Sequence, residues 1–182
     1  MKNLLVIMGG SGTGKTTVAR KLEEYGYCRL VTTTTRPRRK GEIDGVSYHF
    51  VTEEEFQRIP KVEWAMYAGN FYGLSMKEIE EKGKRYDNLV VVLEKKGAEN
   101  VKKIYGELVT VVFLRISKEE MERRLSERGD TQENIQARIQ HAVEQGEFEP
   151  PKFADLVVEN KNLEDTVKAI LEHQKKKPLP CR

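Results

Sequence analysis

Cysteine is scarce in this chain of 182 residues, which contains only Cys28 and Cys181. The two cysteines are far apart and in no metal-ligand spacing, so the sequence indicates neither a disulfide framework nor a cysteine-based metal site. Long apolar runs are also missing, and the one at residues 4–8 is too short for a signal-peptide core or a membrane span. We therefore expect free thiols, no membrane partner and a cytoplasmic location.

The chain also lacks a large excess of positive or negative charge. Thirty-two basic residues face 29 acidic ones, and the net charge of +3 is too small to predict nucleic-acid binding. With 34% charged and 38% hydrophobic residues, the composition is that of a folded globular protein rather than of a disordered chain. The length suits one domain with small insertions. The composition leaves monomer and homodimer both open.

Apolar runs that alternate with helical patterns are present instead. Strands are expected at residues 4–8, 46–51, 89–93, 108–114 and 156–158. Helices are expected at residues 15–24, 97–105, 117–128, 132–145 and 163–174, with a further short one after the capping box Thr52/Glu55. This alternation predicts an α/β fold with a parallel sheet and helices on both faces.

The glycine-rich segment that follows the first strand carries the strongest chemical signal. It fits the pattern G-x-x-x-x-G-K-[ST] between a strand and a helix, which is the context that phosphate binding requires. Its members are Gly9, Gly10, Ser11, Gly12, Thr13, Gly14, Lys15 and Thr16. Glycines let backbone N–H groups turn toward phosphate oxygens, Lys15 neutralises β- and γ-phosphate charge, and the Thr16 hydroxyl suits Mg²⁺. The segment predicts a P-loop for a nucleoside triphosphate, with Thr17 included in the site.

A second phosphate site is predicted in the segment at residues 31–50, which reads VTTTTRPRRKGEIDGVSYHF and has no apolar periodicity. A phosphate monoester is a dianion, and forked guanidinium groups together with a phenol hydroxyl bind it through charge-assisted hydrogen bonds. Arg36, Arg39 and Tyr48 are the candidates. A solvated charged loop is the competing interpretation.

The same segment closely resembles the acceptor motif of guanylate kinase, S-x-S-x-T-T-R-x-P-R-x-G-E-x-x-G-x-x-Y-x-F. The positions in register are Thr34, Thr35, Arg36, Arg39, Gly41, Glu42, Gly45, Tyr48 and Phe50. The later stretch EWAMYAGNFYG is similar to the family's E-W-A-x-x-x-G-N-x-Y-G. By this resemblance Glu63 would accept hydrogen bonds from guanine, Tyr72 would hold the phosphate, and Thr32 and Ser75 would belong to the same GMP site.

The resemblance extends to a lid and to the end of the last strand. The stretch RRLSERGDTQENIQARI resembles the guanylate kinase lid, which makes Arg124, Arg128 and Arg138 the catalytic cations that stabilise charge on the transferred phosphoryl group. VVENKNLED is similar to the family's V-N-D-D-L-D and would place Asn160 at the adenine edge. No histidine is assigned a catalytic role, because the acceptor oxygen is already anionic.

Several positions depart from the family pattern, and two of them concern the acceptor base. Leu74 stands where the family has Ser or Thr, and Val92 replaces the first Asp of D-x-D-x-Q-G, while Glu94 keeps a carboxylate at the second position and could bind Mg²⁺ through water. These departures leave open a phosphorylated acceptor other than GMP. A non-catalytic interaction module is the third possibility, against which Lys15, the lid arginines and the lack of an accompanying domain argue.

The resemblance implies one three-layer P-loop NTPase domain over residues 1–182, with a parallel central sheet, a small inserted acceptor-binding lobe and a helical lid. The expected boundaries are a core at about 1–31, 87–125 and 146–175, a lobe at about 32–86 and a lid at about 126–145. The implied reaction is Mg²⁺-dependent transfer of the γ-phosphoryl group of ATP to GMP.

Overall fold

The computed structural model describes residues 1–10, 12–67, 69–127, 129–144 and 146–176. Two of the expected site residues, Ser11 and Arg128, lie outside the described residues, as does Cys181. Within the described residues none of the helices is both long enough and apolar enough to cross a membrane.

Five parallel strands form the central sheet in the order β2-β7-β1-β8-β9. Their bounds are β1 Asn3–Gly9, β2 Cys28–Arg29, β7 Asn88–Val92, β8 Val109–Arg115 and β9 Leu156–Glu159. β1 lies in the middle, and its register with both neighbours aligns Ile7 with Val92 and with Val112. The glycine-rich segment therefore begins at the carboxyl edge of the sheet, where open α/β sheets bind their ligands.

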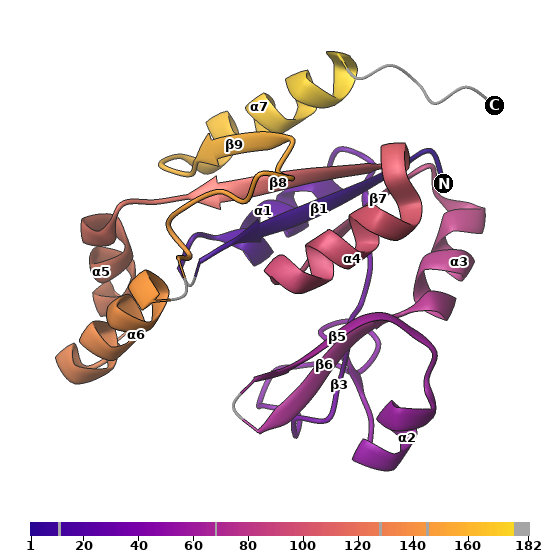
Figure 1. Ribbon diagram of the computed structural model, residues 1–182, viewed down its shortest axis with the longest axis horizontal. Helices are drawn as coiled ribbons and strands as arrows, with labels where there is room; N and C mark the ends of the chain where they lie inside the picture. Colours follow the sequence, from indigo (N-terminus) through magenta and orange to yellow (C-terminus); the bar gives the residue numbers. More distant parts are fainter. Residues whose placement is uncertain (11, 68, 128, 145, 177–182) are drawn as a thin grey trace.

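Helices cover both faces of this sheet, as the sequence predicts (Figure 1). The helices of the core are α1 Lys15–Glu23, α3 Met76–Arg85, α4 Lys95–Tyr105 and α7 Leu163–Lys176, with a 3₁₀ turn at Gly106–Leu108. Alternate residues of β1 point to opposite faces. Leu4 and Val6 pack in the cluster that includes Val101 of α4, whereas Leu5 packs with Leu22 of α1.

A second, four-stranded sheet is built from the segment between β2 and α3, in the order β4-β3-β6-β5. The bounds are β3 Thr33–Thr34, β4 His49–Phe50, α2 Glu53–Arg58, β5 Lys61–Tyr67 and β6 Asn70–Ser75. β5 and β6 pair antiparallel, with an irregularity in register between Lys61 and Glu63. We call residues 32–75 the inserted lobe, which lies below the central sheet in Figure 1.

Two further helices, α5 Lys118–Glu127 and α6 Gln132–Glu144, lie together at one end of the central sheet (Figure 1). They pack on each other through Met121, Leu125 and Ile135, with Ala142 completing the small apolar cluster. Ser117 caps α5 by accepting a hydrogen bond from the Glu120 N–H at 3.2 Å. The lid expected at about residues 126–145 corresponds mainly to α6, and the stretch that resembles the family's lid begins on α5; their role as a lid stays a prediction.

The sequence predicts most elements of the central sheet and its helices to within two or three residues, and fewer of those in the inserted lobe. The expected capping box of α2 is confirmed, because the Thr52 hydroxyl accepts from the Glu55 N–H and the Glu55 carboxylate accepts from the Thr52 N–H. The strand expected at residues 46–51 is present only as His49–Phe50. The sequence does not predict β2, β3, β5, β6 or α3. β2 and β3 have two residues each, β5 and β6 show no clean apolar period, and α3 is mostly charged.

Candidate active site

The glycine-rich loop adopts the conformation that its glycines allow. Gly12 and Gly14 have φ values of 75° and 86°, in the left-handed region. A Cβ atom on Gly14 would lie 2.6 Å from the Asn160 amide nitrogen, so the position also needs the absence of a side chain. The loop leads directly into the first turn of α1, whose N-terminal N–H groups favour a bound anion.

Lys15 turns back over this loop. Its ammonium group donates hydrogen bonds to the Gly9 carbonyl at 2.6 Å and the Gly10 carbonyl at 3.0 Å. The Thr13 hydroxyl donates to the Gly10 carbonyl at 2.8 Å. The positive charge of Lys15 is thus held over the curve of the loop, while the side chains of Thr16 and Thr17 are exposed to solvent.

Asn160 braces the loop from the end of β9. It is 5% exposed, and its amide nitrogen donates to the Thr13 carbonyl at 2.6 Å while its amide oxygen accepts from the Thr166 hydroxyl at 2.9 Å. Both amide atoms are therefore occupied within the protein. The adenine contact expected for Asn160 remains a prediction, and its observed contacts serve the shape of the loop.

Arg124 joins the lid to the loop. Its guanidinium group donates to the Asn160 carbonyl at 2.5 Å and to the Gly12 carbonyl at 3.3 Å, and the Glu120 carboxylate accepts from Nε at 2.6 Å. Arg138, on α6, lies 3.9 Å from the Asp130 carboxylate and is 46% exposed. Of the two candidate catalytic arginines that the structure describes, Arg124 reaches the loop, and Arg138 points to a carboxylate of the lid itself.

Arg36 gathers with aromatic side chains in the inserted lobe. Its guanidinium carbon lies 5.5 Å from the ring centroid of Tyr48 and 5.8 Å from that of Phe50. The Tyr48 and Tyr72 rings meet edge to face at 6.0 Å. We call Arg36, Tyr48 and Tyr72 the phosphate cluster, since one guanidinium group and two phenol hydroxyls converge there. The structure thus brings together three residues that the sequence predicts from two separate segments.

Glu42, which the sequence reading placed in a motif without giving it a role, organises this cluster. One carboxylate oxygen accepts from the Arg36 guanidinium group at 2.6 Å, and the other accepts from the backbone N–H of Arg39 at 2.7 Å. These two hydrogen bonds, of which the one from Arg36 has the larger effect, hold the pKa of Glu42 below its ordinary value. The negative charge and the short sequence distance to both arginines were the available signals.

Glu63 lies in a different setting, on β5 near the start of α4. It is 8% exposed, and its Oε2 atom lies 2.6 Å from where a Cβ atom on Gly97 would stand. Burial, opposed by the hydrogen bond from the Leu74 N–H and assisted by the charge of Glu94, raises the pKa of Glu63 to about 7. Gly97 is therefore the residue that leaves room for this carboxylate, a role that the sequence alone does not reveal.

The remaining expected residues occupy varied positions. Ser75 is 8% exposed and caps α3 by accepting from the Glu78 N–H at 3.1 Å. Leu74 is fully buried among core residues. Thr32 is half-buried and Glu94 is exposed at the N-terminus of α4.

Comparison with known proteins decides the family. The family model described as guanylate kinase matches residues 1–176. The chain belongs to the guanylate kinase family. It is 39% identical over 179 residues to a guanylate kinase of Chlorobaculum tepidum, covering 92% of this chain and 89% of the relative. It is 36% identical over 163 residues to one of Fusobacterium nucleatum, covering 86% of this chain and 88% of the relative.

A solved structure agrees in fold as well as in sequence. The crystal structure of guanylate kinase from Anaplasma phagocytophilum superposes with a TM-score of 0.75 and 29% sequence identity, covering 99% of this chain and 88% of that one. The P-loop NTPase fold predicted from the motif is therefore confirmed.

Proposed function

We propose that the chain transfers the γ-phosphoryl group of ATP to the phosphate of GMP, giving ADP and GDP, the reaction for which its family is named. The observation that carries the proposal is the coexistence of a P-loop on the central sheet with the phosphate cluster of Arg36, Tyr48 and Tyr72 on the inserted lobe. Two phosphate sites of different design in one chain suit a donor and an acceptor.

On the donor side, the loop N–H groups would bind the phosphates of ATP, and Lys15 would exchange its two carbonyl partners for β- and γ-phosphate oxygens. The proposed ATP-binding residues are Gly9, Gly10, Ser11, Gly12, Thr13, Gly14, Lys15, Thr16, Thr17 and Asn160. The exposed hydroxyls at the start of α1 and the bracing of the loop by Asn160 support this assignment.

On the acceptor side, Arg36, Arg39, Tyr48 and Tyr72 would bind the phosphate of GMP, and Glu63 would bind the guanine base. Guanine presents two adjacent donors, N1–H and the 2-amino group, whereas adenine presents an acceptor at N1 and no donor at C2. A carboxylate supplies two acceptors that match guanine. Thr32 and Ser75 complete the proposed GMP site.

We also propose that Mg²⁺ binds with the nucleotide at Thr16 and, through water, at Glu94. Mg²⁺ prefers hard oxygen ligands and is often held by one or two protein oxygens together with substrate phosphates. The exposed Thr16 hydroxyl and the exposed Glu94 carboxylate fit that mode, and no group of three or more His, Cys, Asp or Glu side chains that could hold a metal occurs among the described residues. The ion would offset charge on the β- and γ-phosphates.

The chemical step needs positioning and positive charge more than proton transfer. A GMP phosphate oxygen forms a bond to the γ-phosphorus of ATP as the bond to the β-γ bridging oxygen breaks, and that oxygen leaves with ADP. Lys15, Arg124, Arg128 and Arg138 are the proposed catalytic cations. Arg124 already bonds the Gly12 carbonyl, which supports its approach to the phosphates.

The proposed division of labour follows the chain. The core at about residues 1–31, 87–125 and 146–175 would hold ATP. The acceptor-binding part at about 32–86, which comprises the inserted lobe and α3, would hold GMP, and the lid at about 126–145 would complete the site. Cys28, a free and half-buried thiol, supports a reducing cytoplasmic location.

A panel of acceptors tests the proposed function. With Mg-ATP as donor, kcat/KM for GMP is expected to exceed that for AMP and UMP by at least roughly 10²-fold, because these bases leave Glu63 with unmatched acceptors. dGMP belongs in the same panel, and omission of Mg²⁺ with EDTA is expected to abolish turnover. Equal or better turnover of a monophosphate without guanine would overturn the assignment of GMP.

Arg36→Lys is expected to raise the KM for GMP by roughly 10- to 100-fold, the cost of a charge-assisted hydrogen-bond network, with the KM for ATP unchanged. Lysine keeps the charge but not the fork that bonds Glu42 and faces Tyr48. Steady-state kinetics with each substrate varied provide the measurement. Arg58→Lys makes the same change at an exposed arginine of the same lobe and should leave both KM values unaltered. An unchanged KM for GMP in Arg36→Lys would exclude Arg36 from the phosphate site.

A further inference from the structure

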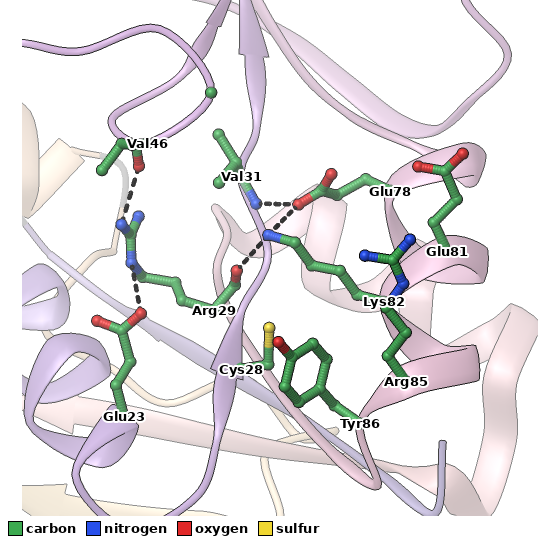
Figure 2. Close-up of a pocket in the computed structure, with 11 residues that line it drawn as sticks. Glu23, Cys28, Arg29, Val31, Val46, Glu78, Glu81, Lys82, Arg85 and Tyr86 are labelled. Atoms are coloured by element: carbon green, nitrogen blue, oxygen red, sulfur yellow. Dashed lines mark hydrogen bonds and ion pairs between the residues drawn. The ribbon is translucent and has the colours of Figure 1, made fainter.

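A buried carboxylate on α3 connects three segments of the chain. Glu78 is 8% exposed, and one of its oxygens accepts from the backbone N–H of Val31 at 2.8 Å and lies 2.6 Å from the Lys82 ammonium group. The other oxygen lies 3.3 Å from Nε2 of His49. Figure 2 shows Glu78 between Val31 and Lys82, with Lys82 also reaching the carbonyl of Arg29 at 2.8 Å. None of these residues belongs to the substrate sites described above.

Two of the three segments join the inserted lobe to the core, and the third lies within the lobe. Val31 precedes the lobe and lies beside the end of β2, and α3 is the connection by which the chain returns from β6 to β7. His49 lies within the lobe on β4, where its N–H donates to the Thr32 carbonyl at 2.9 Å. One carboxylate therefore touches both connections between core and lobe, as well as a strand of the lobe.

Charge makes this arrangement stronger than a neutral hydrogen-bond network. Burial acts to raise the pKa of Glu78, but the hydrogen bonds from His49, Lys82 and the Val31 N–H outweigh it and lower that pKa to about 2. The hydrogen bond to Glu78 raises the pKa of His49 above its ordinary value. Asp44 also favours protonated His49, whereas burial and the charge of Lys82 act against it. The carboxylate thus stays ionised, and the charge of His49 changes with pH.

His49 is next in sequence to Tyr48, which belongs to the phosphate cluster. Tyr48 immediately precedes β4, in an isolated bridge with Asp44. Successive side chains of extended backbone point to opposite sides, so a contact that fixes His49 on one side also restricts the direction of Tyr48 on the other. The centroid of the Tyr48 ring lies 5.5 Å from the guanidinium carbon of Arg36 and 6.0 Å from the centroid of the Tyr72 ring. Packing of this kind is sensitive to small displacements of the backbone that carries the ring.

We propose that Glu78 is a positioning residue for the acceptor substrate, which holds β4 through His49 and the lobe connection through Val31 so that Tyr48 stays within the phosphate cluster. This role rests on the proposed function, since it concerns the site for the GMP phosphate. Glu78 does not touch the acceptor itself. Its contribution is expected in the KM for GMP, and not in the binding of ATP at the opposite side of the site.

Glu78→Gln tests this role, because it keeps the shape of the side chain and removes the charge. The KM for GMP is expected to rise roughly 2- to 30-fold, the range typical of residues that act through packed neighbours, with the KM for ATP and kcat within about twofold of the parent. Glu81→Gln is the matched control, since Glu81 is on the same helix and, within the part of the chain that the structure describes, its one ion pair is an exposed one with Lys77 at 3.7 Å. The control should leave all three parameters unchanged.

A second variant and a spectroscopic readout separate positioning from simple stabilisation. His49→Asn, at a side chain that is 40% exposed, should raise the KM for GMP by a similar factor, and the double variant should be no worse than either single one. In the parent protein the NMR titration of the His49 ring should have its midpoint above 6.5, and in Glu78→Gln the midpoint should fall toward 6.5. The phosphate of GMP and the carboxyl group of Glu63 also change charge with pH. They do so equally in every variant, so the ratio of the KM values of two variants at one pH is free of their contribution.

The outcomes are distinct. If Glu78→Gln and Glu81→Gln share one KM for GMP, or if the His49 midpoint is the same in the parent and in Glu78→Gln, the positioning role is wrong while the kinase assignment stands. Failure of the parent chain to phosphorylate GMP would instead overturn the proposed function, and this inference with it.

Discussion

Lys15→Ala is expected to lower kcat by at least roughly 10²–10³-fold, which is the usual cost of removing one preorganised donor to developing charge. In the structure the Lys15 ammonium group lies over the loop at 2.6 Å and 3.0 Å from two loop carbonyls, so it is already aimed at the space that the β- and γ-phosphates would occupy. Alanine supplies neither the charge nor the reach. A coupled assay of ADP formation with GMP as acceptor measures the loss.

The fold should survive this change. Lys15 is in the first turn of α1, and the core beneath it is formed by Val18, Ala19 and Leu22, which the substitution does not touch. Far-ultraviolet circular dichroism should therefore match that of the parent. Lys21→Ala is the matched control on the same helix: it removes ion pairs to Glu24 and Glu164 at 2.9 Å and 3.1 Å, and turnover should be unchanged. Retained turnover in Lys15→Ala would remove the P-loop from the mechanism.

The donor half of the molecule could be predicted from sequence because its signals are local. The apolar run at residues 4–8, the glycines and Lys15 follow one another without a gap, and each step has a single physical interpretation. Residues 4–8 of β1 are buried in the middle of a parallel sheet, so this run is apolar throughout and easily recognised. The two buried clusters on either side of the sheet follow from the alternation along this one strand.

The acceptor half was predictable in its motifs and not in its scaffold. β5 and β6 pair antiparallel in a small sheet with exposed side chains such as Trp64 and Met66, which are 52% and 64% exposed, so the strands show no clean apolar period. α3 contains mostly charged residues and buries only Glu78 and Ile79. The elements that carry the acceptor residues are therefore held by contacts between segments distant in sequence, and these contacts leave no short pattern.

Site residues likewise divide into those that the sequence indicates by their chemistry and those whose role depends on tertiary contacts. The sequence points to Arg36 and Tyr48 because a phosphate needs their chemistry, whereas Glu42 and Gly97 matter through the neighbours that they hold or make room for. Asn160 illustrates the reverse case: the resemblance selects the position, but both of its amide atoms bond within the fold. Tertiary contacts of this kind become visible only when the chain is folded.

The structure also shows where two residues that depart from the family pattern, Leu74 and Val92, are located. Leu74, which lacks the expected hydroxyl, is fully buried in the core cluster, and its N–H is a partner of the Glu63 carboxylate. Val92 is at the end of β7, two residues before the exposed Glu94. In the proposed acceptor site, recognition of the base would therefore rest mainly on Glu63 among the described residues.

Glu63→Gln is expected to lower kcat/KM for GMP by roughly 10²–10⁴-fold, since two hydrogen bonds to a charged acceptor, worth about 1.5–3 kcal/mol each, are replaced by one neutral bond and one donor facing a donor. Turnover of AMP should change little, so the preference for GMP should shrink by nearly the same factor. The acceptor panel, repeated with this variant, provides the measurement. An undiminished preference for GMP would show that Glu63 does not read the base.

The pH dependence supplies an independent check on the same residue. Because burial raises the pKa of Glu63 to about 7, the carboxyl group is largely neutral at lower pH and then offers guanine one acceptor in place of two. Binding of GMP to the ionised form must therefore weaken as pH falls through 7, by up to about tenfold per pH unit. The phosphate of GMP, with its second pKa near 6, contributes equally to the parent and to Glu63→Gln. The kcat/KM of the parent divided by that of Glu63→Gln should thus rise from pH 6 to pH 8. A ratio independent of pH would contradict the assignment of this titration to Glu63.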